Sequence, residues 1–186
     1  MPDRVIPAEW LPEGRTVHRV IVHWTGGAYK VSALDKAHYH AVIGGDGKAV
    51  KGLIGAGYRA PHTRNLNQSS YGLSIACMAG AREGGPYGAF PLTELQYERA
   101  AQAAADVVAA YDLAVTPRTV LCHQEVTYVY GPEATPPGPE SLRQRGKWDI
   151  SELPWERKAG VVRPREAIWS GFRDKVLWYL REYHGR

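Results

Sequence analysis

Three residues far apart in the chain could together bind a metal ion: His23, His123 and Asp149. Each histidine follows a short apolar run, and Asp149 lies in a later loop segment. Two imidazoles and one carboxylate are the protein ligands of many catalytic zinc sites, in which water takes the fourth position. Lys147, two residues before Asp149, would place a positive charge beside such a site. If these side chains converge, the pattern predicts metal-dependent hydrolysis.

The two histidines are predicted to stand at the ends of buried strands. Residues 17–23 read VHRVIVH and residues 119–123 read TVLCH. Both runs are short and apolar, which is typical of core strands. Strands that run side by side in a sheet bring their ends together, so we expect His23 and His123 to lie close in space. A lone histidine is usually structural, but two at matching strand ends with a carboxylate favour a metal site.

The other elements alternate between strands and helices. Ser32 is predicted to cap a short helix that ends at about residue 37, and Thr93 with Gln96 forms a capping box for a helix that ends at about residue 112. That helix carries a predicted apolar stripe: Leu95, Ala103, Val107 and Tyr111. The remaining predictions are a hairpin at 38–52, a strand at 72–79, a Pro/Gly-rich surface loop at 127–146 and a helix at 164–183. Interleaved strands and helices predict an α/β fold.

Composition limits the classes of protein that fit. The 186 residues suit one domain, and 44% hydrophobic residues is ordinary for a globular protein. No apolar run approaches the roughly 18 residues that cross a bilayer, and the first residues lack the apolar segment of a signal peptide. We therefore expect synthesis in the cytoplasm and no stable membrane insertion. Cys77 and Cys122 are expected to be buried thiols.

Six segments stand out in order along the chain: VIVHWTGG at 20–27, HYHAVIGGDGKAVKG at 38–52, APH at 60–62, NQSSYGLSIA at 67–76, CHQEV at 122–126 and GKWD at 146–149. Taken together they resemble zinc-dependent N-acetylmuramoyl-L-alanine amidases of the type 2 family, which includes phage lysozyme amidases and peptidoglycan recognition proteins. The order of the segments carries the resemblance, since each alone is weak. The resemblance implies a single amidase domain over residues 1–186, with a central mixed β-sheet flanked by helices. Its motifs fill a core at 17–150, on which the helix at 164–183 is docked.

Carried over residue by residue, the resemblance implies that His23, His123 and Asp149 bind Zn²⁺. Tyr39 matches a tyrosine that helps to activate the zinc-bound water, and Lys147 matches a lysine that stabilises the tetrahedral oxyanion. Some cytosolic relatives use a glutamate in the strand where this chain has Ser74, so Tyr39 is the better candidate for proton handling. The alternatives are a packing role for Tyr39 and a solvent-facing Lys147.

Further residues have open roles at this stage. The resemblance places His62 in a segment that lines the amidase cleft, and it implies substrate contacts for His62, Asn67 and Thr25; a surface histidine is the alternative for His62. Strand alternation would put His38 and His40 on the face opposite Tyr39. Glu125 either orients an imidazole or caps the following loop. The loop at 127–146 either grips substrate or is a plain insertion. The Trp-rich last helix either packs on the core or binds the wall or a membrane surface.

The implied function is hydrolysis of the amide between N-acetylmuramic acid and L-alanine in peptidoglycan. Without a signal peptide, we expect a phage or prophage endolysin that reaches the cell wall after release. A wall-recycling amidase and a secreted effector amidase stay open, as does action in a host cytoplasm. A recognition module that binds peptidoglycan without cutting it is the main alternative, and Lys147 with Asp149 favours catalysis. The net charge of +4 prompts a nucleic-acid binder only weakly, because no basic stripe with interleaved aromatics precedes the last helix. We expect a monomer.

Overall fold

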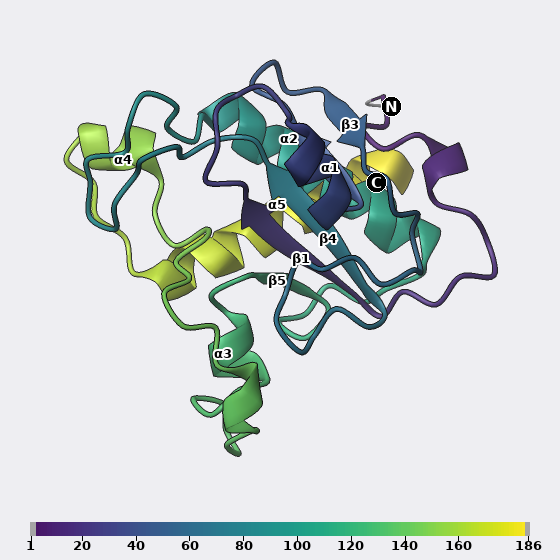
Figure 1. The fold of residues 1–186 in the computed structure, drawn as a ribbon. Helices are drawn as coiled ribbons and strands as arrows, with labels where there is room; N and C mark the ends of the chain where they lie inside the picture. The colour runs from purple at the N-terminus through teal and green to yellow at the C-terminus, as the bar shows by residue number, and fades with distance from the viewer. Residues whose placement is uncertain (1–2, 185–186) are drawn as a thin grey trace.

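A mixed β-sheet forms the centre of the molecule in the computed structural model, which describes residues 3–184. Within these residues the sheet has five strands in the order β3-β2-β4-β1-β5 (Figure 1). The strands are β1 (Arg19–Trp24), β2 (Ala41–Ile43), β3 (Ala49–Lys51), β4 (Ser70–Ile75) and β5 (Val120–Cys122). Only β2 and β3 pair antiparallel; β1 pairs parallel with β4 and β5, and β2 parallel with β4. The predicted α/β fold with a mixed sheet is confirmed.

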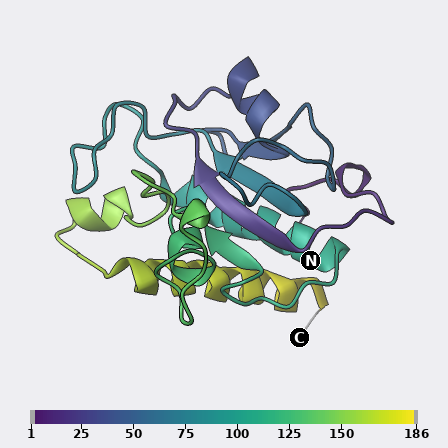
Figure 2. The same cartoon turned by 60° about the horizontal axis from the view of Figure 1, so that its bottom comes forward.

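Two long helices cover one side of this sheet. They are α2 (Glu94–Ala110) and α5 (Arg165–His184), which pack against each other; α2 also contacts β1, β2 and β4, and α5 contacts β5 (Figure 2). The short helices are α1 (Ala33–His38), α3 (Val126–Val129) and α4 (Pro154–Lys158), with single 3-10 turns at Ala8–Trp10 and Glu140–Leu142. The predicted caps of α1 and α2 are confirmed, since Ser32 and Thr93 each form a capping box.

The alternation of side chains along β1 decides where its histidine points. Three alternate residues of β1 pack in the main core: Val20, Val22 and Trp24. Ile21 instead packs in a second, small cluster with Leu121 and Val126. Because successive strand residues face opposite sides, His23 shares the side of Ile21. The first candidate ligand therefore projects away from the helix-covered core.

Both cysteines are buried and free, as predicted. Cys122 packs in the main core, while its neighbour Leu121 faces the small cluster. Alternation thus separates the Cys122 thiol from His123, so this thiol is no candidate ligand.

The segment before β2 is helical, which corrects the predicted hairpin at 38–52. The hairpin strands cover only β2 and β3, and α1 continues to His38. Tyr39 then caps the helix, because its backbone N–H donates to the Asp35 carbonyl over 3.1 Å. The alternation argument that separated His38 and His40 from Tyr39 was therefore wrong for His38.

Four other features differ from the prediction. The strand predicted at 72–79 runs from Ser70 to Ile75. Leu95 is 52% exposed, because the buried face of α2 begins with Gln96 and Tyr97. The predicted surface loop at 127–146 contains part of α3 and a 3-10 turn, and its residues Thr127 and Gln144 are buried. Helix α4 was not predicted. Among the helices of residues 3–184, none has the length and apolar character to cross a membrane.

Candidate metal centre

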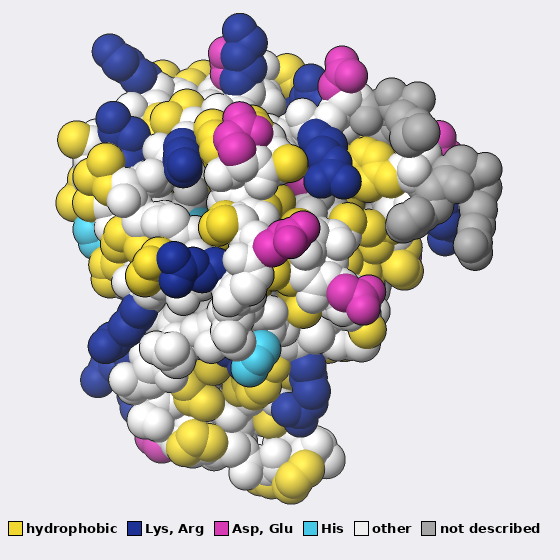
Figure 3. Space-filling view, turned by 90° about the vertical axis from the view of Figure 1, so that its right-hand side faces the viewer, with side chains coloured by type: hydrophobic (Ala, Val, Ile, Leu, Met, Phe, Trp, Pro, Cys, Tyr) yellow, Lys and Arg dark blue, Asp and Glu magenta, His cyan; other side chains and the backbone are white. Residues whose placement is uncertain are grey.

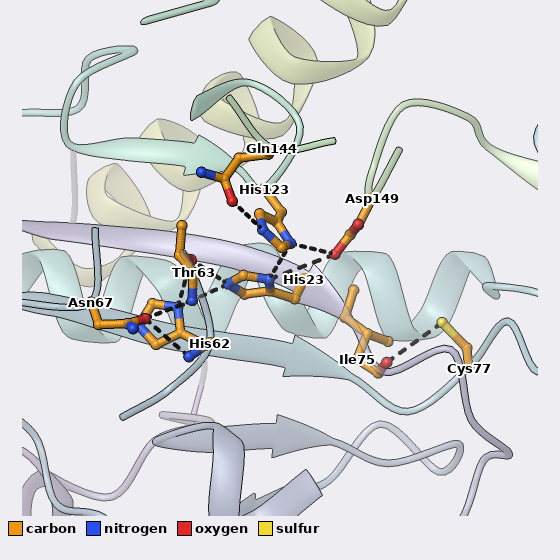
Figure 4. Close-up of polar contacts among 9 residues, drawn as sticks. All are labelled: His23, His62, Thr63, Asn67, Ile75, Cys77, His123, Gln144 and Asp149. Carbon is orange, nitrogen blue, oxygen red and sulfur yellow. Dashed lines mark hydrogen bonds and ion pairs between the residues drawn. The ribbon is translucent and has the colours of Figure 1, made fainter. Parts of the chain in front are cut away.

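His23, His123 and Asp149 meet at one buried point beside the sheet (Figure 4). His23 is the fifth residue of β1, and His123 directly follows β5, which pairs with β1 in parallel. The two Nδ1 atoms lie 3.0 Å apart. One Asp149 carboxylate oxygen lies 3.1 Å from Nδ1 of His123 and 3.6 Å from Nδ1 of His23. The parallel pairing of two strands thus brings together the histidines that are 100 residues apart.

These three ligand atoms fit a tetrahedral zinc ion. Ligand atoms about 2.0–2.1 Å from a zinc ion lie about 3.3–3.4 Å apart at tetrahedral angles. The distances of 3.0, 3.1 and 3.6 Å bracket that value. Two imidazoles and one carboxylate also leave the fourth position for water or substrate. The donor set and its spacing therefore suit a metal ion such as zinc.

The second nitrogen of each imidazole has its own partner. His23 Nε2 lies 3.0 Å from His62 Nδ1, and His123 Nε2 lies 3.2 Å from Gln144 Oε1. Such outer contacts orient a ligating imidazole and fix which nitrogen faces the metal. Here they leave the two Nδ1 atoms to face the carboxylate of Asp149.

The ionisation states favour metal binding. Burial, aided by the neighbouring His123, lowers the pKa of His23 to about 4. Burial alone would raise the pKa of Asp149, but the charges and hydrogen bonds of His123 and His23 hold it well below its usual range. At neutral pH, His23 is thus a neutral imidazole and Asp149 a carboxylate, and these are the forms that bind a metal ion.

A polar cleft opens onto two of the three candidate ligands, His123 and Asp149, while His23 is fully buried behind them. Tyr39, Lys147, Thr25 and His62 line this cleft together with His123 and Asp149. Six further residues complete the lining: Trp24, Gly26, His38, Pro61, Gly146 and Trp148. The structure therefore gathers most of the predicted site residues around one opening. A larger hollow lies between α4 and the segment 84–94, and it contains none of the three candidate ligands.

Tyr39 lies beside the first histidine. The ring centroids of Tyr39 and His23 are 5.2 Å apart, at a tilted angle. Burial raises the pKa of Tyr39 to about 12, and the negative charge of Asp149 adds to the rise. The phenol is therefore protonated at neutral pH and can donate a hydrogen bond into the cleft. Helix capping, not strand alternation, puts it there.

The three predicted substrate contacts differ in what they touch. His62 is buried and bonded to His23, so its Nδ1 is engaged with a ligand residue. Asn67 accepts the backbone N–H groups of His62 and Thr63 at 3.0 and 2.6 Å, which holds the turn that carries His62. Thr25 lines the cleft and accepts the N–H of Gly27. Substrate contact by any of the three stays a prediction.

Glu125 and His40 have structural partners. The carboxylate of Glu125 accepts the N–H of Cys122 and pairs with Arg173 of α5 at 2.8 Å. It therefore holds the turn around His123 in place. As the N-cap residue of α3 it makes no side-chain hydrogen bond to that helix, so the predicted capping of the following loop is not observed. His40 is buried; its Nε2 lies 2.9 Å from the Tyr58 carbonyl, and its Nδ1 accepts the N–H of Gly72.

The sequence analysis did not identify two residues that shape the site, Gln144 and Gly72. No sequence pattern points to Gln144, because it lies in a Pro/Gly-rich segment with no regular spacing. Gly72 could have been noticed, since a glycine inside a strand often marks a close approach of another group. A Cβ atom at Gly72 would lie 2.6 Å from the His62 ring, so this position of β4 needs a residue without a side chain.

Comparison with known proteins places this arrangement in a family. The model of the N-acetylmuramoyl-L-alanine amidase family matches residues 13–139, which include His23, Tyr39, His62 and His123. Lys147 and Asp149 lie beyond the matched range. A comparison with curated protein sequences gave no significant match.

Several solved structures are similar to this chain at low sequence identity. The hydrolase AmiA of Staphylococcus aureus, solved with its ligand, is 15% identical, with a TM-score of 0.58 over 92% of this chain and 76% of that chain. PlyL is 17% identical, with a TM-score of 0.51 over 95% of this chain and 97% of that chain. The endolysin of the Thermus scotoductus bacteriophage Ph2119 is 19% identical over 63% of this chain and 77% of that chain, with a TM-score of 0.46.

The chain therefore shares its fold with AmiA and PlyL. The family match covers more than half of the chain, and the chain belongs to the N-acetylmuramoyl-L-alanine amidase family. It is an amidase of peptidoglycan.

Proposed function

We propose that this chain is a zinc-dependent amidase that cuts the bond between N-acetylmuramic acid and L-alanine. The observation that carries the proposal is the convergence of His23, His123 and Asp149 at one buried point, beside a cleft that His123, Asp149 and Lys147 line. Zinc bound there would lower the pKa of a water molecule towards about 7 and polarise the scissile carbonyl.

Two other residues of the cleft, Lys147 and Tyr39, have separate roles in the proposed reaction. Lys147 is tied to the site by its position two residues before Asp149, and its ammonium group stabilises the negative charge that grows on the carbonyl oxygen. Preorganised groups of this kind contribute about 3–4 kcal/mol each to catalysis. Tyr39 holds a proton on its hydroxyl and donates a hydrogen bond to the reacting oxygen or the leaving nitrogen.

Catalysis is favoured over recognition alone. Relatives that only bind peptidoglycan include chains that lack the third ligand, whereas this chain has Asp149 within 3.1 Å of His123 and Lys147 in the same cleft. The nucleic-acid alternative finds no support on the face shown in Figure 3, where Lys and Arg side chains of the described residues are interspersed with acidic and apolar ones.

We also propose that the protein acts on the cell wall as a monomer, as a phage or prophage endolysin. Recycling and effector amidases would cleave the same bond. Ser74, which faces the same side of the sheet as His23, stands where some recycling relatives have a glutamate, and this departure argues against the recycling type.

Digestion of purified cell walls tests the proposal. The protein should contain about one zinc per chain and release peptides with free L-alanine amino ends, identified by mass spectrometry. Release of reducing sugars in place of amino ends would show glycosidase action and overturn the assignment. The variant Asp149→Ala should lose both zinc and amide cleavage, and unchanged zinc content in it would remove Asp149 from the metal centre.

A further inference from the structure

We propose that Gln144 is a positioning residue that fixes the tautomer of His123 for zinc binding; this rests on the zinc site of the proposed function. Gln144 is buried and belongs to the Pro/Gly-rich segment between α3 and Lys147. Its amide oxygen lies 3.2 Å from Nε2 of His123 (Figure 4). The loop for which substrate contact and a plain insertion were both open from sequence thus reaches the candidate metal centre.

The orientation of the Gln144 amide is determined by its other contacts. Its Nε2 donates to two backbone carbonyls, those of Leu142 at 2.9 Å and Arg64 at 3.1 Å. Carbonyl groups accept hydrogen bonds and cannot donate, so the NH₂ end of the amide must face them. The oxygen end is left to face His123.

The tautomer of His123 follows from this orientation. An amide oxygen only accepts, so Nε2 of His123 must carry the hydrogen in the contact. In the neutral ring, Nδ1 then has a free lone pair. That lone pair points to the place where His23 Nδ1 lies 3.0 Å away and the Asp149 oxygen 3.1 Å away. Without the contact, the neutral ring could place its hydrogen on Nδ1 and block the metal.

Gln144 is itself held by segments on both sides of the cleft. Its backbone N–H donates to the Thr127 hydroxyl at 2.9 Å, and its carbonyl accepts the N–H of Lys147. The Arg64 carbonyl comes from the loop that carries His62. One residue therefore links that loop, the start of α3 and the approach to Lys147, and its only side-chain acceptor is aimed at a ligand.

The test compares zinc affinities of three variants with the parent chain. Each protein is stripped of metal and titrated with zinc in competition with a chromophoric chelator, and the thermal unfolding of the metal-free protein is recorded. Gln144→Leu keeps the size of the side chain but removes the acceptor, so its zinc Kd should rise by about 10- to 100-fold. Gln144→Glu keeps an acceptor oxygen and loses the two N–H donors. It should unfold at a lower temperature, yet bind zinc within about threefold of the parent.

A matched control loosens the same segment without touching the acceptor. Asn65 donates to the Ser141 carbonyl at 2.8 Å and has a positive φ of 61°, so Asn65→Gly removes the bond without backbone strain. Its zinc Kd should stay within about twofold of the parent. If it weakens zinc as much as Gln144→Leu does, the effect belongs to the loop and not to the acceptor, and the proposal is wrong.

Two further outcomes would contradict the inference. Parent-like zinc affinity in Gln144→Leu would show that the acceptor is unnecessary, and equal losses in Gln144→Leu and Gln144→Glu would assign the effect to the lost donors. A parent chain that takes up no zinc would instead overturn the proposed function. If Gln144→Leu does not fold, long-range ¹H–¹⁵N spectra of the zinc-loaded parent decide. His123 should carry its hydrogen on Nε2 with Nδ1 on the metal, and the reverse would overturn the proposal.

Discussion

Replacement of Gly72 by alanine should damage both stability and zinc binding, although alanine is normally the better strand residue. The added Cβ would lie 2.6 Å from Cγ and Cδ2 of His62, whereas ordinary contacts begin at 3.4 Å. The ring must therefore retreat by about 3.4 − 2.6 = 0.8 Å. A retreat of that size stretches its 3.0 Å contact with His23 beyond hydrogen-bond range.

The cost has two separable parts. Overpacking of this kind destabilises a fold by about 1–3 kcal/mol, which urea unfolding of the metal-free protein measures. Loss of the outer contact to His23 should weaken zinc binding by about 10-fold or more, measured by chelator competition. Gly171→Ala is the matched control. It lies in α5 with open space around its Cβ position, and it should be neutral or stabilising by about 0.5–1 kcal/mol.

A double-mutant cycle identifies the clashing partner. In a His62→Ala background the ring is gone, so Gly72→Ala should cost less than about 0.5 kcal/mol. An undiminished cost in that background would show that the alanine collides with something else, and the reasoning about His62 would fail.

The remaining predictions concern charge and protons. Lys147→Ala should keep its zinc but lose about 100- to 1,000-fold in kcat, and full wall digestion by this variant would exclude the oxyanion role. Tyr39→Phe keeps the ring beside His23, so its zinc content should be unchanged while turnover falls by about 100-fold or more; normal turnover would leave only packing. Arg173→Leu leaves the buried Glu125 carboxylate without its ion-pair partner and should lower the free energy of unfolding, measured in urea, by about 3 kcal/mol. The double variant Arg173→Leu/Glu125→Gln should recover this stability. Burial lowers the pKa of His23 to about 4, so in the metal-free protein the unfolded chain binds this proton first as the pH falls. Stability should therefore be full above pH 6.5 and drop by about 3 kcal/mol on the way to pH 4, and a flat profile over that range would contradict the burial of a neutral His23.

Local patterns in the sequence predicted the parts of the site that strands and caps determine. His23 and His123 end apolar runs, and parallel pairing of β1 with β5 does bring them together. Ser32 predicted the start of α1 because a capping box involves only neighbouring residues. The end of α1 was harder to predict, because the stretch that contains His38, Tyr39 and His40 fits either a strand or a last helical turn.

Contacts between distant segments were beyond such patterns. No local sequence pattern distinguishes a histidine that contacts His23 from one that contacts substrate, because His62 lies in the cleft in either role. The role of Gln144 depends on carbonyls of Arg64 and Leu142, of which one is 80 residues away. Periodicity and capping describe a residue's own element, whereas these roles arise only when loops from different elements close over the sheet.

The difference between local patterns and contacts between distant segments matters most for Asp149, because a long Pro/Gly-rich segment precedes it in the chain. The structure shows that its anchors lie outside that segment. Its backbone carbonyl accepts the N–H of Gln124, the residue after His123, at 3.2 Å. Trp148 packs edge-on against Trp24 of β1 with ring centroids 4.6 Å apart, and Ile150 is fully buried in the core. The third ligand is therefore held by the residues beside it and by the end of β5, so the length of the preceding loop can change at little entropic cost without moving the carboxylate.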